Sequence, residues 1–496
     1  MLSLIVFLPL IAAAILMVAP AIGGVTSRWI GIAVSVVELI LVGWLWLNYQ
    51  TPEPNGLAFE EQLPWMPGVN TSYHVGVDGL ALPLVAMTVV IFLACAIFSL
   101  RDQRRPRQHT ALFLFLQCVS LGLFVAADLI LFFVFFDLSI VGMYFVIATW
   151  GQRNAVRSAR KFFLYTFLGS LALLLGFIGL YVTAEPHTFD IIELVAMSPV
   201  KEKPVAGSLI LAALVVGLAI KTPTIPFHTW LPPAHTDAPA TGSAVLAGVL
   251  LKMGTYGFVR IAMPILPATW RSWAWGILLV GLVSVLYGAL VALAQTDLKR
   301  MIAYTSVNHM GYIIMALGAV GLVTQSTADA TSIAVTGAVV QMVSHGLITA
   351  ALFLLTGVMH TRTGSYQISA YGGLAATAPR YATVFGIAAF ASLGIPGLSG
   401  FIAEFQIFAG SIAVAPVTAF ALPGILITAA LFLRAIQRVF TGPTRGLSRE
   451  FNDITGTQLS PVGILLGLSL LIGVAPQTLL SVVEPASTVL VELIGG

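Results

Sequence analysis

Apolar stretches of membrane-spanning length alternate with short polar segments along almost the whole chain. Because a helix needs about 20 mostly apolar residues to cross a bilayer, this pattern predicts about fourteen transmembrane helices. We expect them near residues 2–20, 28–49, 77–100, 110–126, 129–150, 161–184, 206–227, 240–263, 270–295, 300–320, 328–360, 381–413, 415–438 and 459–480. The predicted fold class is therefore an all-α polytopic membrane protein.

The basic residues predict an orientation for these helices. With both termini outside, four of the 23 Lys and Arg residues fall outside (Lys201, Lys203, Arg260 and Arg271), Lys221 and Lys252 fall within spans, and the rest lie inside. Since basic residues gather in inner loops, this separation favours a multi-pass protein with both termini outside. The basic run "RDQRRPRQH" at 101–109 then reads as an orientation anchor, not a nucleic-acid site.

Two predicted helices carry breaks. Proline inside a helix removes a hydrogen bond, and "KTPTIPF" places Pro223 and Pro226 near the end of the seventh helix. "SLGIPGLSGF" does the same in the twelfth helix. Because five helices separate the breaks, the two broken helices run in opposite directions, as in transporters built from inverted repeats. We predict a single transmembrane domain of N-terminal helices (1–109), repeat one (110–263), repeat two (270–440) and a last helix (459–480).

Composition excludes several function classes. The chain is 58% hydrophobic and 9% charged, with a mean hydropathy of +0.98, whereas soluble domains carry about 25% charged residues. The two cysteines, Cys95 and Cys118, lie in apolar runs and lack the spacing of a metal site. No nucleotide-binding motif is found, so we expect no cofactor and no metal in this chain.

Four ionisable residues fall in mid-span: Asp137, Lys221, Lys252 and Glu404. Inserting each charged side chain at a helix centre costs about 2.5–3.5 kcal/mol unless it is paired or hydrated. This cost indicates that the residues have a functional role. Lys221 is expected at the carbonyl end of the first half of its helix, and Glu404 in the first turn of a second half, where the helix dipole favours each charge.

Two histidines, His309 in "SVNHMGY" and His345 in "QMVSHGL", lie in the spans between these charges, and Gln341 is one turn before His345. The pattern predicts a lateral proton relay, because histidine and buried lysine exchange protons near neutrality. In this hypothesis Asp137 tunes Lys221, Lys252 and the histidines carry the proton, and Glu404 passes it outward.

Structural alternatives stay open. Asp137 and Lys221 form either part of the relay or a static ion pair, and His309 and His345 are either relay members or core histidines. His228 and His235 fall near the inner mouth, where proton uptake and a simple loop role are equally compatible with the sequence. Glu38, outside both repeats, is interpreted as a contact with a neighbouring subunit in preference to a relay member. Asp78, near the end of a span, is interpreted as a cap or a local hydrogen-bonding residue.

The stretch "KTPTIPFHTWLPPAHTDAPATGSAVLAGVLLKMGTYGFVR" resembles the helix 7–8 signature of the antiporter-like subunits of proton-pumping NADH:quinone oxidoreductase (respiratory complex I), above all the M subunit. "AYTSVNHMGY", "QMVSHGLITAALFLLTG", "GIPGLSGFIAEFQIF" and "GVDGL" match the same family. The acid at Glu404 also resembles the M subunit, since the L subunit and antiporter relatives carry lysine there. One departure is Asp137, where the family usually has glutamate, so its pairing with Lys221 is expected to be looser.

The resemblance implies a proton-translocating subunit of the bacterial cell membrane, driven by redox chemistry elsewhere in a complex. Flavin, iron–sulfur clusters and quinone are then expected in partner subunits, with sister antiporter-like subunits and the lipid bilayer as neighbours and no nucleic acid. The alternative functions are a subunit of a multisubunit cation/proton antiporter and a structural scaffold.

Overall fold

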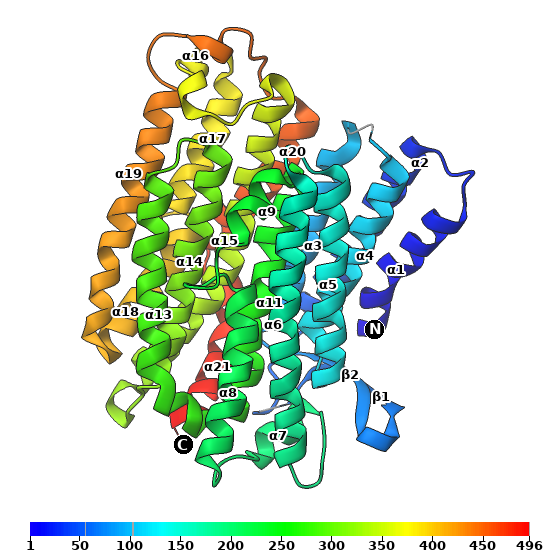
Figure 1. Cartoon of the computed structure of the whole chain (residues 1–496), viewed down its shortest axis with the longest axis vertical. Coiled ribbons are helices and arrows are strands. Elements are labelled where there is room, and N and C mark those ends of the chain that lie inside the picture. The colour runs from blue at the N-terminus through cyan, green and yellow to red at the C-terminus, as the bar shows by residue number, and fades with distance from the viewer. Residues whose placement is uncertain (55, 102–103, 496) are drawn as a thin grey trace.

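The computed structural model describes residues 1–54, 56–101 and 104–495, and it is a bundle of helices that run side by side (Figure 1). The longer helices are α1 (Leu2–Val18), α2 (Gly24–Leu47), α3 (Leu82–Phe98), α4 (Pro106–Val125), α5 (Leu129–Trp150), α6 (Ala155–Thr183), α8 (Pro204–Lys221), α13 (Pro267–Leu293), α14 (Leu298–Val320), α15 (Ala328–Thr363), α17 (Pro379–Ser392), α18 (Ser399–Val414), α19 (Leu422–Val439), α20 (Gly456–Val474) and α21 (Gln477–Gly495). Short helices include α7 (Ile191–Met197), α9 (Leu231–Asp237), α10 (Ala240–Val245), α11 (Leu251–Gly257), α12 (Met263–Ile265) and α16 (Leu374–Thr377).

These elements confirm the predicted all-α membrane fold. Within the described residues, eleven helical segments are long and apolar enough to cross a membrane, and α1, α3 and α18 are shorter apolar helices. Most predicted spans agree with an observed helix to within several residues. Of the basic run at 101–109, Asp102 and Gln103 lie outside the described residues. The division into two repeats stays a prediction.

The seventh and twelfth spans are broken as predicted. Helix α8 ends at Lys221 and α9 begins at Leu231, while α17 ends at Ser392 and α18 begins at Ser399. Irregular backbone inside a membrane must find partners within the protein. At the first break, Trp230 Nε1 donates to the Ile220 carbonyl (2.9 Å), and the Ile225 amide donates to Ser284 Oγ (3.0 Å).

Helix α15 occupies the middle of the bundle and provides the frame for the polar residues described below. The middle of α15 is buried within the chain. The helix packs against α3, α14, α18, α20 and α21. Figure 1 shows α15 among the green and yellow helices at the centre of the view. Polar side chains on α15 are therefore held away from lipid.

Two regions differ from the sequence-based expectation. Residues 50–76, expected to be loop, contain an antiparallel hairpin of β1 (Ala58–Met66) and β2 (Thr71–Val77). After α20 the chain forms a further helix, α21, beyond the expected last span at 459–480. That segment contains Pro485, Glu484 and Glu492, which interrupt the apolar run that identifies spans.

A histidine anchors the hairpin to the bundle. His74 on β2 is buried; its Nδ1 contacts Asp190 Oδ2, and its Nε2 contacts Glu60 Oε1 at 2.7 Å. Asp190 also caps α7, because its Oδ1 accepts from the amides of Ile192 and Glu193. Burial lowers the pKa of His74, but the hydrogen bonds and charges of Asp190 and Glu60 outweigh it and raise the pKa above 6.5.

We therefore expect hairpin docking to weaken at alkaline pH. A histidine whose pKa is raised on folding contributes stability that is fully present below its unfolded value of 6.5 and is lost as pH rises through the folded pKa. Amide hydrogen exchange of β2, corrected for its intrinsic pH dependence, should show greater protection below pH 6.5 than at a pH above the folded pKa of His74. His74→Gln should remove the difference, and an equal pH dependence in this variant would contradict the assignment.

Candidate functional site

Lys252 lies where the eighth span departs from regular α-helix. A π-helical segment, η3 (Leu246–Leu250), precedes α11, and a second one, η4 (Phe258–Ala262), follows it. Such segments free backbone groups and are frequent at functional sites. Lys252 is fully buried, and its Nζ donates to the Ala247 carbonyl at 2.6 Å. The helix distortion thus supplies a carbonyl acceptor for a buried ammonium.

The second partner of Lys252 is His345 on α15. Lys252 Nζ lies 2.6 Å from His345 Nδ1, and His345 Nε2 lies 3.1 Å from Ser306 Oγ on α14. When the lysine is an ammonium, Nδ1 must accept, so the ring is neutral and its Nε2–H donates to Ser306. The ring therefore has one nitrogen facing the lysine and one facing α14.

His309 and Glu404 continue this polar line. The His309 and His345 ring centroids are 5.4 Å apart. His309 Nδ1 lies 3.6 Å from Glu404 Oε1 and 3.0 Å from Gln341 Nε2, and His309 Nε2 lies 3.3 Å from Ser392 Oγ. The structure thus brings Lys252, His345, His309 and Glu404 together across four helices.

A small cavity joins the two histidines to Glu404. It leaves about 10 Å³ in which the centre of a water molecule can lie, and its lining includes His309, His345, Gln341, Ser392 and Glu404. Polar walls of this kind suit water, which needs several hydrogen-bonding partners to occupy a buried cavity. Protons can pass between histidine rings that do not touch if such a cavity is hydrated.

The backbone at the second break approaches Glu404 closely. Gly394 has φ +68°, a conformation that favours glycine. A Cβ atom at this position would lie 2.7 Å from Glu404 Oε2. The sequence-based placement of Glu404 in the first helical turn is wrong, because α18 begins at Ser399 and Glu404 lies in its second turn. The stabilisation by the helix dipole is therefore weaker than expected, since it falls off beyond the first turn.

Lys221 forms a separate part of the site. It is the last residue of α8, as predicted, and is buried. Its Nζ donates to Ser139 Oγ at 2.9 Å and lies 4.7 Å from the centre of the Phe136 ring, both on α5. A cation over an aromatic face is stabilised electrostatically. Helix α5 thus holds Lys221 through the Ser139 hydroxyl and the Phe136 ring, and not through a carboxylate.

Asp137 does not contact Lys221 directly. Within the described residues, no ion pair joins the two, and Asp137 Oδ1 has no hydrogen-bond partner. The charges are close enough to interact. The alternative of a tight, static Asp137–Lys221 pair is wrong, and the looser pairing agrees with the shorter aspartate side chain.

Asp137→Glu is expected to preserve proton translocation, because one more methylene brings the carboxylate nearer to Lys221. The variant should match the wild type in redox-driven acidification of vesicles to within about threefold, the effect of less than 1 kcal/mol. Asp137→Asn is the matched change that removes the charge and should reduce translocation. An inactive glutamate variant would contradict the mapping of Asp137 onto this site.

His228 and His235 have different surroundings. His228 lines a polar cavity with Lys161, Asp237 and other polar residues, about 450 Å³ in volume and partly open to solvent. His235 is fully buried against the Phe353 ring, and within the described residues neither of its ring nitrogens has a partner. His228 thus lies at a mouth, while His235 lies behind it.

Several polar residues of the site escaped the sequence-based analysis. Lys299, assigned there to an inner loop, is fully buried and donates to the Ala238 carbonyl at 2.6 Å. It lies close enough to His235 for their charges to interact, as does Lys252. Ser139, Ser306 and Ser392 were missed because a serine in an apolar helix gives no signal of its own. The burial of Lys299 could be inferred only from the packing of α14.

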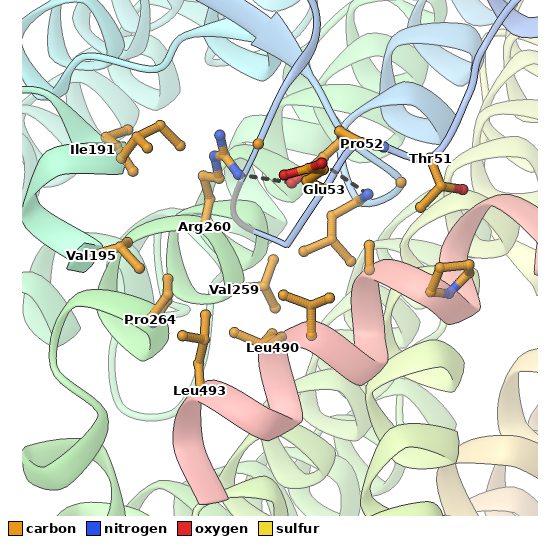
Figure 2. Close-up of a pocket in the computed structure, with 18 of the residues that line it drawn as sticks. Thr51, Pro52, Glu53, Ile191, Val195, Val259, Arg260, Pro264, Leu490 and Leu493 are labelled. Carbon is orange, nitrogen blue, oxygen red and sulfur yellow. Dashed lines mark hydrogen bonds and ion pairs between the residues drawn. The ribbon is translucent and has the colours of Figure 1, made fainter. Parts of the chain in front are cut away.

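Another cavity, at the ends of α2 and α21, lies apart from these residues. Figure 2 shows Arg260 at its polar end, and Val259, Leu490 and Leu493 along its apolar wall. Arg260 Nη1 donates to Asp78 Oδ2 at 2.7 Å. Asp78 Oδ1 accepts from the amides of Leu80 and Ala81, so Asp78 is the local cap that its position predicts.

Known proteins resemble the chain along its length. Residues 126–430 match the family model described as "NADH:quinone oxidoreductase/Mrp antiporter, TM". NADH-quinone oxidoreductase subunit M of Rickettsia prowazekii is 37% identical, over 92% of this chain and 91% of the relative. The subunit M of Rhodobacter capsulatus is 36% identical, over 99% and 96%.

A solved structure agrees with these relatives. The structure of respiratory complex I from Thermus thermophilus with bound NADH contains a chain that superposes with a TM-score of 0.90 at 28% identity, covering 100% of both chains. The family match spans more than half of the chain, and the relatives cover nearly all of it. The chain therefore belongs to the NADH:quinone oxidoreductase/Mrp antiporter family of transmembrane proteins.

Proposed function

We propose that the chain translocates protons as an antiporter-like membrane subunit of NADH:quinone oxidoreductase. The observation that carries the proposal is the polar line from Lys252 through His345 and His309 to Glu404, buried in the middle of the bundle. Ionisable residues in a membrane are costly and mark ion pathways. A purely structural scaffold gives no reason for four such groups to line up.

The proton steps follow from the contacts. Lys252 as an ammonium gives a proton to His345 Nδ1 along their 2.6 Å contact, and the ring releases its other proton from Nε2. Water in the cavity shared by the histidines and Glu404 carries the proton to His309. Glu404 then accepts it across the 3.6 Å approach to His309 Nδ1, and releases it toward the outer side.

Proton uptake is assigned to the polar cavity at His228. Protons reach this cavity from the inner side, on which the basic loops of the chain lie. His235 and Lys299, whose charges interact, then connect the cavity with Lys252. In this pathway His235 exchanges a proton with Lys299 and then with Lys252. This role accounts for its ring nitrogens, which have no fixed partner among the described residues.

The energy source lies in partner subunits. Flavin, iron–sulfur clusters and quinone would be held there, and sister antiporter-like subunits would flank this chain in the bacterial cell membrane with both termini outside. The relatives named subunit M of NADH-quinone oxidoreductase support this assignment. Here the chain contributes proton transfer without redox chemistry of its own.

Purification of the intact membrane complex that contains the chain tests the proposal. Flavin and iron–sulfur signals should copurify with the chain, and NADH with quinone should drive proton translocation in proteoliposomes. A complex that lacks both signals and exchanges Na⁺ for H⁺ would contradict the proposal and would assign the chain to a cation/proton antiporter instead.

A further inference from the structure

Glu38 on α2 faces the interior of the chain. The buried residues of α2 recur at helical spacing and include Arg28, Gly31, Ser35, Glu38 and Val42. The interpretation of Glu38 as a contact with a neighbouring subunit is therefore wrong: its side chain is 0% exposed, and the face of α2 that carries Trp29, Ile40 and Trp44 is the exposed one. A mid-span acid on the inward face requires another explanation.

Polar atoms of three buried residues, two on this face of α2 and one on α4, lack protein partners. Within the described residues, Arg28 Nη2, Gln117 Nε2 and both carboxyl oxygens of Glu38 have no hydrogen bond. The residues are 6%, 1% and 0% exposed, respectively. Buried polar groups almost always have a partner, either in the protein or in ordered water. Three exceptions between α2 and α4 indicate a hydrated strip.

A cavity runs along part of this strip. Its lining includes Arg28 and Ser35 of α2, Ser99 beyond α3, and His109 and Gln117 of α4. It leaves about 20 Å³ in which the centre of a water molecule can lie, and it is partly open to solvent. One buried water needs roughly 10–15 Å³ of such space, so the cavity has room for about one. Ser35 Oγ donates to Gln117 Oε1 at 3.2 Å, so these two residues form the polar end nearest Glu38.

Within the described residues, no ion pair balances a carboxylate at Glu38. Helix α1 has no titratable side chain, and α3 has only Cys95, whose thiol lies 3.8 Å from the Thr241 carbonyl. Helix α4 contributes Arg107, His109 and Cys118, and Cys118 is close enough to interact with Glu38. Arg107 lies in the first turn of α4 and donates to the Ala19 carbonyl at 3.3 Å. Arg28 lies nearly three turns away along α2 and donates to the Leu100 carbonyl at 2.6 Å.

We propose that Glu38 is a proton-binding site, separate from the line of residues between Lys252 and Glu404, that exchanges its proton with water on the Arg28 side through the cavity between α2 and α4. A buried carboxyl without a cationic partner avoids the cost of an unpaired charge by binding a proton. Ser35 and Gln117 relay the exchange, because Ser35 lies one turn before Glu38 on the buried face of α2 and is hydrogen-bonded to Gln117 in the cavity lining. The site does not rest on the proposed function.

Infrared difference spectroscopy of the intact complex tests this site. The wild type minus Glu38→Gln spectrum should contain the C=O stretching band of a protonated carboxyl, and this band should shift when the solvent is changed to D₂O. Glu450→Gln makes the same chemical change at an exposed position and should leave the band in place. Absence of the band, or a band that does not shift in D₂O, would overturn the proposal.

Two more variants test the path and protect against a failure of assembly. Gln117→Leu should slow the D₂O shift at least severalfold, and exchange as fast as in the wild type would overturn the path. If Glu38→Gln does not assemble, Glu38→Asp keeps the carboxyl, and its band should move in frequency. Spectra of the wild type and the aspartate variant that are identical would overturn the site.

Discussion

Replacement of Lys252 by methionine is expected to slow redox-driven proton translocation by roughly 100-fold, within the range that positioned acid–base groups contribute. Methionine keeps much of the volume and the apolar stem, so the packing around η3 and α11 should survive. It removes the ammonium that joins the Ala247 carbonyl to His345 Nδ1. Acidification of proteoliposomes driven by NADH and quinone measures the effect.

Lys203→Met is the matched control for this change. Lys203 is exposed at the N-terminus of α8, so its loss removes a charge of the same type far from the relay. Translocation should stay at the wild-type level in this variant. Normal translocation in Lys252→Met, or an equal loss in both variants, would contradict the role of Lys252.

Lys221→Ala is expected to abolish proton pumping, the second large effect. The substitution removes the cation that α5 holds through Ser139 and Phe136, and with it the charge on which Asp137 acts. Alanine also leaves a cavity, so Lys221→Met, which fills more of the space, separates the charge from the packing. Both variants should lose pumping in vesicles, while Lys201→Ala, at an exposed position, should retain it.

The outcome with Ser139→Ala sharpens the interpretation of Lys221. This variant keeps the lysine but removes its hydrogen-bond acceptor, so an intermediate rate is expected. Unchanged pumping in Lys221→Ala would rule out this residue as a member of the relay. Loss of pumping in the alanine variant alone, with normal pumping in Lys221→Met, would assign Lys221 a packing role.

Most of the helices could be predicted from the sequence because lipid imposes a simple rule: a span must be long and apolar. The two breaks were equally predictable, since closely spaced prolines and glycines disfavour a continuous helix. The π-helical segments around Lys252 left no such trace, because they arise from packing and not from residue type. The hairpin was missed because the polar residues, Pro64 and Gly76 in its strands resemble a loop.

Prediction of the site was more uneven. The mid-span charges identified Asp137, Lys221, Lys252 and Glu404, but no pattern showed that Lys221 would bond to Ser139 or that Lys299 would be buried. Such contacts depend on how α5, α8 and α14 pack, and one sequence carries little information on that. Glu38 was misread for the same reason, because α2 is apolar on every side except at a few positions.

The ratio of protons translocated to quinone reduced tests the central claim most directly. It should be measured in proteoliposomes that contain the intact complex, with wild-type chain and with Glu404→Gln, which keeps the shape of the side chain but cannot carry the proton onward from His309. The account predicts that this ratio falls in the variant, while quinone reduction continues when a protonophore is added. An unchanged ratio would contradict it.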